Sequence, residues 1–518
     1  MNGKIRKHLH LTRQGGHVKK ILHLSALVLV FLLTSAAPLL PPDPEKAMQD
    51  FLNVFWDADE KYFYQNSWRT GLGGPGPVGG LYADFWWEAQ LWDLVMDAFE
   101  RDPNEQYRQM IDDVYDGFVV HNANWENDFN DDLGWWAQGA VRAYNLTGNE
   151  RYLEQAKILF ERIWAYWTDD YGGGVLWKNT GEDQKNVATN GPLTVTAVRL
   201  YQATGDESYL EKARMLWNFV NEQLTDGEAR VYDNYENGEL RQWDFTYNFG
   251  NFILASLALR EVSEDETEKE MLLERSVLSA DWVLENLTNS GILLDEGLGD
   301  GGGFKGVFVR ALNKLRNVPE LSAEKQNDYS QFLQDNATQV WNQRRASDGI
   351  TGGDWSSPVP EEAPVQVLAA ASAVAVLQLA PVSEEAKVIV GDGRYEAENS
   401  LRLKVSSNNS QSGYTGRGYV DHFERDESAI VFRVNVSETK TYRVQFRYST
   451  ITESSRQLFV NDSEAATRVF PASSEWALLE TTLELAAGSN TLTLKFDDKT
   501  NTGVLNLDHI QLILNGDS

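Results

Sequence analysis

The chain has 518 residues, enough for more than one domain, and its 46 Lys and Arg against 77 Asp and Glu give a formal net charge of −31. This charge disfavours nucleic acid and anionic membranes as partners, and it favours a neutral substrate or bound cations. The absence of cysteine from the sequence excludes disulfides, thiolate metal ligands and cysteine nucleophiles.

Residues 1–37 have the pattern of a secretory signal peptide. Basic residues precede an apolar run from Ile21 to Leu33, and small residues follow it at Thr34 to Ala37. The run is short for a membrane span, although an extension to Leu40 leaves an uncleaved anchor as the alternative. We therefore expect a secreted protein without a stable membrane span, with association with the cell surface as the alternative.

Residues 44–381 have the spacing of successive helices, and an internal repeat predicts how they are arranged. Tyr144 to Leu159 reads YNLTGNERYLEQAKIL, and Tyr201 to Leu216 reads YQATGDESYLEKARML. The offset is 57 residues, about the length of a helical hairpin with a long loop, so the segment holds about six hairpins. Six hairpins in a ring form an all-α (α/α)6 toroid, and an open helical superhelix is the alternative.

The stretch from Phe129 to Gly148, FNDDLGWWAQGAVRAYNLTG, predicts a helix with one buried stripe. We expect Asn130 to be its N-cap and Gly148 to end it in the left-handed conformation. Asp131 and Asp132 fall in the first turn, where carboxylates suit the helix dipole. They cap the helix or form the carboxylate pair of a glycosidase, and their position at the mouth of a ring favours the pair.

Other inner helices begin with residues suited to sugar binding. Aromatic rings stack on sugars, polar side chains bond their hydroxyls, and a glycine-rich loop permits close approach, whereas core packing and loop flexibility are the alternative explanations. The candidate substrate-binding residues of the helical body are Trp86, Trp87, Trp135, Asn186, Asp244, Tyr247, Asn248, Phe304 and Lys305.

The helical body contains five ordered blocks: the aspartate-pair stretch, the first helix with its two tryptophans, GGGVLWK with the later KN and TN, TYNFGN, and GGGFKGVFVR. Together these blocks resemble glycoside hydrolase family 76, the endo-α-1,6-mannanases. The resemblance implies a retaining double displacement on α-1,6-linked mannan without a cofactor. It implies that Asp131 is the nucleophile and Asp132 the acid/base.

From residue 394 to 518, alternating apolar residues replace helical spacing and predict an all-β sandwich, jelly-roll-like, after a linker at 382–393. YEAEN, GYTGRGYVDHF and LNLDHIQL resemble carbohydrate-binding modules of families 6 and 35. The resemblance places Glu396, Glu398 and Asp508 as calcium (Ca2+) ligands, unless the two glutamates only face solvent. Trp476 and Asn506 are candidates for sugar binding, with a core role for Trp476 as the alternative.

The expected function is that of a secreted endo-acting hydrolase of α-1,6-mannan that acts as a monomer. A mannan transglycosylase would share its covalent intermediate. A non-catalytic mannan-binding surface protein would share its aromatic platform. An inverting enzyme acting on a β-glucan or a uronide would hold its two carboxyl groups farther apart.

Overall fold

The computed structural model describes residues 42–71, 74–381, 394–415, 418–436, 438–461 and 463–513. The predicted signal peptide, residues 1–37, and the predicted linker, residues 382–393, lie outside these ranges. Within them, no helix is long and apolar enough to cross a bilayer.

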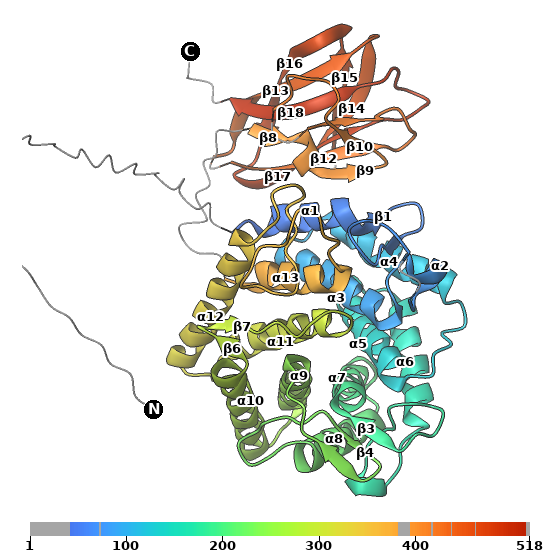
Figure 1. The fold of residues 1–518 in the computed structure, drawn as a ribbon, viewed down its shortest axis with the longest axis vertical. Coiled ribbons are helices and arrows are strands. Elements are labelled where there is room, and N and C mark those ends of the chain that lie inside the picture. Colours follow the sequence, from blue (N-terminus) through green and yellow to red (C-terminus); the bar gives the residue numbers. More distant parts are fainter. Residues whose placement is uncertain are drawn as a thin grey trace, which may run out of the picture. The chain divides into compact units, whose positions relative to one another are not determined.

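The helical part of the described chain has an inner and an outer layer (Figure 1). The inner helices are α3 (Phe85–Arg101), α5 (Asn130–Thr147), α7 (Val187–Thr204), α9 (Thr246–Val262), α11 (Gly301–Arg316) and α13 (Val367–Leu379). Each inner helix contacts the next one, and α13 contacts α3, so these contacts run in a cycle.

One outer helix packs on each inner helix. The outer helices are α1 (Pro44–Phe55) on α13, α4 (Glu105–His121) on α3, α6 (Glu150–Trp164) on α5, α8 (Glu207–Gln223) on α7, α10 (Glu266–Asn286) on α9 and α12 (Ala323–Asn342) on α11. The two ends of the helical part meet, because the side-chain amide of Gln378 donates to the carbonyl of Pro44 at 2.6 Å.

The spacing of apolar residues explains which helices lie inside. Helix α6 buries one stripe at three- and four-residue spacing, formed by Tyr152, Leu153, Ala156, Leu159, Phe160 and Ile163. In α13, every residue from Val367 to Gln378 is buried. A helix with one apolar stripe covers a core, whereas a helix that is apolar all round lies within it.

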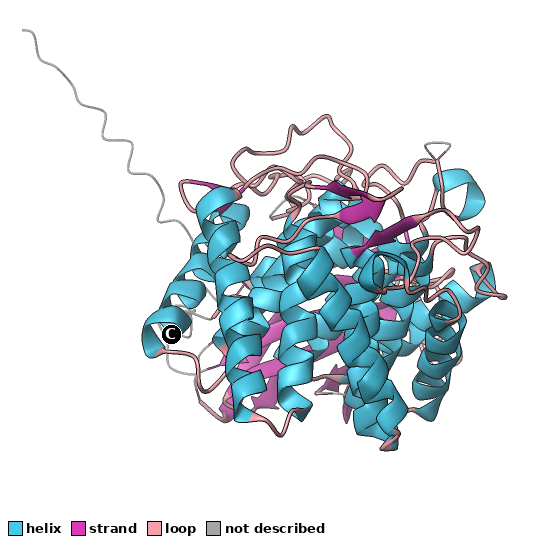
Figure 2. Ribbon diagram, turned by 90° about the horizontal axis from the view of Figure 1, so that it is seen from below, coloured by secondary structure: helices cyan, strands magenta, loops and turns pink. Residues whose placement is uncertain are grey.

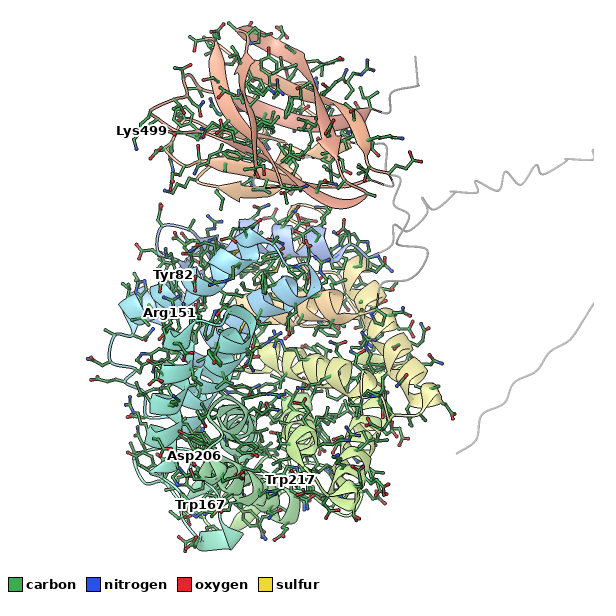
Figure 3. All side chains as sticks on the ribbon, turned by 180° about the vertical axis from the view of Figure 1, so that it is seen from behind. Tyr82, Arg151, Trp167, Asp206, Trp217 and Lys499 are labelled. Atoms are coloured by element: carbon green, nitrogen blue, oxygen red, sulfur yellow. The ribbon has the colours of Figure 1, made fainter. Side chains whose placement is uncertain are left out.

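Tryptophan side chains fill much of the space between the helices. Trp92, Trp136 and Trp355 are fully buried. Trp217 of α8, which Figure 3 labels, donates its indole N–H to the Ser256 hydroxyl of α9 at 2.8 Å. Packing therefore accounts for at least these four of the 17 tryptophans in the sequence.

The repeated sequence corresponds to a repeated structure. Helices α5 and α7 both end at a threonine, and Gly148 and Gly205 follow in the left-handed conformation with φ of 68° and 72°. The predicted cap at Gly148 is thus confirmed. The predicted N-cap at Asn130 is wrong, because α5 begins at that residue and its side-chain amide donates to the carbonyl of Leu176 at 2.9 Å.

Long loops precede the inner helices, and short turns follow them. Figure 2 shows these loops and their short strands gathered at one end of the helices. The short elements are β1 (Trp56–Asp57), β2 (Tyr62–Phe63), α2 (Pro77–Gly80), the 3₁₀ turn at Asp170–Gly172, β3 (Gln184–Asn186), β4 (Asn234–Glu236), β5 (Glu239–Arg241), β6 (Thr288–Asn289) and β7 (Ile292–Leu293). Consequently, the first turns of the inner helices and the long loops lie at the same end of the helical part.

The C-terminal part is β-rich and contains two antiparallel sheets. One sheet contains β8 (Arg394–Glu396), β10 (Ser406–Asn408), β11 (Tyr419–Asp421), β13 (Lys440–Thr450), β16 (Ser473–Leu485) and β18 (Asn506–Ile513). The other contains β9 (Leu401–Leu403), β12 (Ala429–Val436), β14 (Ser454–Val460), β15 (Ser463–Phe470) and β17 (Gly488–Lys495). A shared core, which includes Phe432 and Phe446, joins the sheets.

The predicted order, a helical domain followed by a β-rich domain, is confirmed. The alternation of apolar residues that predicted the sandwich is less clear in β15 than in other strands. That strand has three consecutive exposed residues at its start, Ser463 to Ala465, so its alternation is weak.

Candidate functional site

The predicted aspartate pair lies in a cavity of 340 Å³ at the end of the inner helices that carries the long loops. We call this cavity the aspartate cleft. Its lining residues are Asp84, Trp86, Phe129, Asp131, Asp132, Trp135, Trp177, Gln184, Asn186, Ala188, Asp233, Asn234, Trp243, Tyr247, Asp300 and Phe304.

Asp131 and Asp132 occupy the first turn of α5, and both are half-buried. One carboxylate oxygen of Asp131 accepts from the indole N–H of Trp177 at 2.8 Å and from the Asn186 amide at 3.4 Å. Its other oxygen accepts from the backbone N–H of Asp132 at 3.0 Å. Asp132 accepts from the side-chain amide of Asn127 at 2.7 Å. Neutral donors therefore hold both carboxyl groups in place.

The environment favours a proton on this pair at neutral pH. Burial raises the pKa of Asp131 to about 7, although hydrogen bonds from Trp177, Asp132 and Asn186 oppose the shift. Burial and the neighbouring charge of Asp131 raise the pKa of Asp132 well above its ordinary value. Because the two adjacent carboxyl groups do not readily ionise together, one can remain a carboxylic acid while the other is a carboxylate.

Aromatic rings from four inner helices (α3, α5, α9 and α11) line the cleft, and we call this set the aromatic wall. The ring of Trp86 lies 5.8 Å from Trp135 and 6.5 Å from Phe304. The ring of Phe304 stacks on Tyr247 at 4.1 Å. Such rings offer flat apolar faces to the C–H faces of a sugar.

Asp300, which directly precedes α11, connects that helix to the tryptophans of α3. One of its carboxylate oxygens accepts from the indole N–H groups of both Trp86 and Trp87, each at 2.9 Å. Trp86 lines the cleft, whereas Trp87, which is similarly buried, is not among the lining residues. The indole N–H of Trp87 instead donates to Asp300, and its predicted contact with substrate stays a prediction.

Three further candidates lie away from the cleft. Asp244 forms an ion pair with Arg230 at 2.7 Å. Asn248 is buried and donates to Asp233 at 3.0 Å. The ammonium of Lys305 donates to the carbonyls of Leu294 and Gly353, and burial lowers the pKa of Lys305 to about 8. The carboxylate of Asp244, the side-chain N–H of Asn248 and the ammonium of Lys305 are therefore engaged within the protein.

The remaining candidates of the helical body, Trp86, Trp135, Asn186, Tyr247 and Phe304, all line the cleft. The lining residues that the sequence analysis missed are Asp84, Phe129, Trp177, Gln184, Ala188, Asp233, Asn234, Trp243 and Asp300. A signal was present for two of them: Asp84 and Asp300 directly precede the inner helices α3 and α11.

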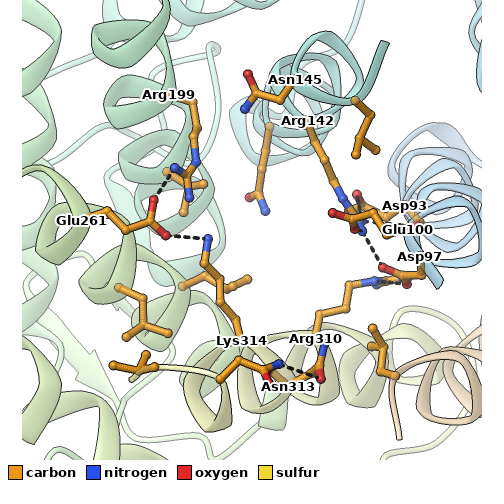
Figure 4. Close-up of a pocket in the computed structure, with 18 of the residues that line it drawn as sticks. Asp93, Asp97, Glu100, Arg142, Asn145, Arg199, Glu261, Arg310, Asn313 and Lys314 are labelled. Carbon is orange, nitrogen blue, oxygen red and sulfur yellow. Dashed lines mark hydrogen bonds and ion pairs between the residues drawn. The ribbon is translucent and has the colours of Figure 1, made fainter. Parts of the chain in front are cut away.

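A larger cavity of 580 Å³ lies toward the opposite ends of the inner helices (Figure 4). Acidic and basic side chains line this cavity and form ion pairs with one another. Arg142 contacts Asp93 at 2.9 Å, Asp97 at 2.7 Å and also Glu100. Glu261 contacts both Arg199 and Lys314. These ion pairs connect neighbouring inner helices, and the aspartate pair is absent from this cavity.

In the C-terminal part, Glu396, Asp508 and His509 bring potential ligand atoms within 4.8 Å of one another. The Thr415 hydroxyl lies between the two carboxylates, at 2.8 Å from Glu396 and 3.0 Å from Asp508. Glu398 lies outside this group of three, in the 3₁₀ turn Ala397–Asn399 that follows β8. The structure thus brings two of the three predicted acidic ligands together, and a ligand role for Glu398 stays a prediction.

Trp476 and Asn506 both contact the turn at 411–413. Trp476 donates its indole N–H to the carbonyl of Ser412 at 3.0 Å, and its ring remains partly exposed. Asn506 donates to Gln411 at 3.0 Å. The two candidates therefore contact neighbouring residues of the same turn.

Several solved structures resemble the helical part. The α-1,6-mannanase GH76A from Salegentibacter sp. HEL1_6 is 31% identical, with a TM-score of 0.59, over 65% of this chain and 97% of that one. An inactive variant of that enzyme, with two consecutive aspartates replaced by asparagine, was solved in complex with α-1,6-mannotriose (30% identity, TM-score 0.59, the same coverage).

Curated relatives match shorter portions. Mannan endo-1,6-alpha-mannosidase DCW1 from Saccharomyces cerevisiae is 26% identical over 273 residues, which are 47% of this chain and 58% of that protein. A cycloisomaltooligosaccharide glucanotransferase from Niallia circulans is 36% identical over 125 residues, 23% of this chain and 13% of that protein. The chain thus spans less than two thirds of the length of these relatives.

Two family models match the chain. Residues 393–515 match the carbohydrate binding module (family 35), in agreement with the predicted C-terminal module. Residues 45–391, more than half of the sequence, match the other model. The chain therefore belongs to glycosyl hydrolase family 76.

Proposed function

We propose that this protein is a secreted, retaining, endo-acting hydrolase of α-1,6-linked mannan. The aspartate cleft carries this proposal, because it places two adjacent carboxyl groups beside an aromatic wall. Family membership and the mannotriose complex of the Salegentibacter enzyme support the choice of substrate. The consecutive aspartates that were replaced in that inactive variant support a catalytic role for the consecutive pair in this chain.

In the proposed reaction, the carboxylate of Asp131 attacks the anomeric carbon while the carboxylic acid of Asp132 protonates the departing glycosidic oxygen. The products of this step are a glycosyl ester on Asp131 and a free mannan end. Asp132, now a carboxylate, then removes a proton from water as the water attacks the ester, which restores both groups. Trp177 and Asn186 donate to Asp131 and stabilise its ionised form before attack.

The decisive experiment is incubation of the purified protein with linear α-1,6-mannan, branched mannan and xylan. We expect oligosaccharides from the linear mannan, and an α-anomer as the first product detected by NMR. Asp131→Asn and Asp132→Asn should each lower kcat/KM about a thousandfold or more, while folding is retained. Release of a β-anomer would instead indicate an inverting enzyme.

Two alternatives have distinct readouts in the same assay. A transglycosylase would form longer oligosaccharides when a mannose acceptor is added, because a sugar hydroxyl would replace water at the ester. A non-catalytic binding protein would bind linear mannan without releasing products, and the two asparagine variants would bind it equally well.

We assign the finer architecture on the same basis. The cyclic contacts of the inner helices and the outer helix on each of them support an (α/α)6 toroid. The two antiparallel sheets with a common core support a jelly-roll-like sandwich. We also propose that the protein is monomeric, which light scattering coupled to size-exclusion chromatography tests directly.

For the C-terminal part, we propose a glycan-binding module that holds a calcium ion. The carboxylates of Glu396 and Asp508 and the hydroxyl of Thr415 offer oxygen ligands of the kind that calcium prefers, whereas the His509 nitrogen suits it less. Trp476 and Asn506 would contact the sugar.

Thermal unfolding tests the calcium site. Calcium chloride should raise the Tm of the C-terminal part by about 5 °C relative to EDTA, because an ion that binds only the folded state stabilises it. Asp508→Asn should abolish the shift, and Glu438→Gln, which changes an exposed carboxylate of the same part, is the control that should retain it. No shift in the unaltered protein would exclude a structural calcium ion.

A further inference from the structure

The acidic side chains of the aspartate cleft have no positively charged neighbour in its lining. Five carboxyl groups line it, those of Asp84, Asp131, Asp132, Asp233 and Asp300. Among the described residues that line the cleft, none is Lys, Arg or His. A cavity of 340 Å³ therefore contains five carboxyl groups, and those that are ionised have no cationic side chain beside them in its described lining.

The hydrogen-bond partners of these carboxylates are neutral as well. Asp233 accepts from the Tyr247 hydroxyl at 2.8 Å and from the Asn248 amide at 3.0 Å. Asp300 accepts from two indole N–H groups, and Asp84 accepts from the backbone N–H of Phe85 at 2.8 Å. These donors fix the orientation of the carboxylates but leave their charge uncompensated.

The opposite cavity of the same helical part shows the contrasting arrangement (Figure 4). Each acidic side chain of its lining contacts an arginine or a lysine; these residues are Asp93, Asp97, Glu100 and Glu261. The protein thus pairs its buried carboxylates at one end of the inner helices and leaves them unpaired in the aspartate cleft.

Uncompensated carboxylates discriminate between ligands by charge. The hydroxyl groups of a neutral sugar can donate to them, whereas a phosphate or carboxylate on the glycan would meet like charge in a partly desolvated cavity. Their mutual repulsion is already evident at Asp84, where burial raises the pKa and the nearby Asp300 charge raises it further.

We propose that the aspartate cleft accepts only uncharged stretches of α-1,6-linked mannan and rejects stretches that bear phosphate or carboxylate groups. This inference rests on the proposed function, which supplies the neutral substrate. It adds a limit on the substrate that neither the family assignment nor the relatives provide.

The test compares α-1,6-mannotetraose with the same tetrasaccharide phosphorylated at C6 of its non-reducing mannose. In buffer with about 20 mM salt, we expect kcat/KM for the phosphorylated compound to be at least about tenfold lower, and we expect salt at about 0.5 M to reduce this ratio several-fold. Salt should hardly change kcat/KM for the neutral tetrasaccharide. A purely steric effect of the phosphate would not depend on salt.

Two isosteric variants locate the effect in the cleft. Asp300→Asn removes one charge while its side-chain oxygen can still accept from the two indoles. Asp84→Asn also keeps a helix-capping side chain. Each variant should lower the neutral-to-phosphorylated ratio of kcat/KM about two- to fivefold at low salt. Glu154→Gln, at an exposed position on the outer helix α6, makes the same change in net charge and should leave the ratio unaltered.

A ratio that depends neither on salt nor on Asp84 and Asp300 would overturn the inference while leaving mannan hydrolysis intact. If the neutral tetrasaccharide is not cleaved, the proposed hydrolysis fails, and calorimetric binding of the two compounds still measures the charge discrimination. If neither compound binds, both proposals fail.

Discussion

Asp131 and Asp132 must carry different numbers of protons for the proposed reaction to proceed. Asp131 has to be ionised to attack, so kcat/KM should rise with pH through its pKa of about 7. Asp132 has to be protonated to assist the leaving group, so kcat/KM should fall once the pH exceeds its raised pKa. We expect a bell-shaped profile whose acidic limb belongs to the nucleophile.

Trp177→Phe tests this assignment. The indole N–H of Trp177 stabilises the ionised form of Asp131, so its removal should raise the pKa of Asp131 and move the acidic limb to higher pH. At a pH on that limb, kcat/KM should fall about fivefold, with a smaller loss at the optimum. Trp243→Phe is the control, because that ring also lines the cleft and should leave the limb in place. If the acidic limb of the pH profile does not move in Trp177→Phe, that limb reports the titration of a group other than Asp131.

The sequence predicts which helical turns reach the cleft, but not which of two adjacent side chains faces it. At the start of α3, Trp86 lines the cleft and Trp87 does not; in α11, Phe304 lines it and Lys305 does not. Adjacent helical residues point about 100° apart, so the repeat locates the correct turn but does not determine which neighbour faces inward. The buried polar partners that engage Lys305 come from distant loops, which no local pattern reveals.

At the scale of the elements, Asp300 joins the start of α11 to the tryptophans of α3. Its carboxylate holds Trp86 beside Trp135 and Phe304 and so fixes one end of the aromatic wall. The opposite end is fixed by the hydroxyl of Tyr247, which donates to Asp233 at 2.8 Å. The wall is therefore held at both ends by carboxylates of the long loops.

Asp300→Ala should disturb this wall without unfolding the helices. Two indole N–H groups lose their acceptor, so we expect KM for linear α-1,6-mannan to rise about tenfold or more. Asp300→Asn keeps the acceptor and should restore a KM within a few-fold of the unaltered protein. Steady-state kinetics of the two variants, with Tm as a folding control, measures the difference. Equal KM values for both variants would show that the charge, not the hydrogen bonds, matters.

The repeat was informative at this scale because it contained the boundaries of the elements. Threonine and glycine end both α5 and α7, and the following acidic residues begin α6 and α8. The sequence could not predict which loops carry Asp233 and Trp243 into the cleft, because those loops lie between helices and lack periodicity.

At the scale of the whole molecule, ion pairs join neighbouring inner helices around the large cavity (Figure 4). They lie at the ends of the helices opposite the aspartate cleft. Arg142 of α5 and Arg310 of α11 both contact Asp97 of α3, each at 2.7 Å. The Asp97 side chain is only 1% exposed, so the loss of a partner would leave a buried charge poorly compensated.

Arg142→Met should therefore lower the free energy of unfolding by about 3 kcal/mol. Lys157→Met is the matched control, because it breaks the exposed pair with Glu154 and should cost less than about 1 kcal/mol. Denaturant unfolding at neutral pH, followed by circular dichroism, measures both. Equal losses in the two variants would contradict the stabilising role of the network.

The contact between Gln378 and Pro44 has a consequence for how the helical part can be built. Helix α1 packs on α13, so the first helix of the helical part can form this contact only after the last one has been synthesised. Because the inner helices contact one another in a cycle, the chain can begin at another hairpin without a change in their cyclic order. A short peptide joining these two ends, with new termini opened in an outer loop, gives a circular permutant that preserves every helix–helix interface.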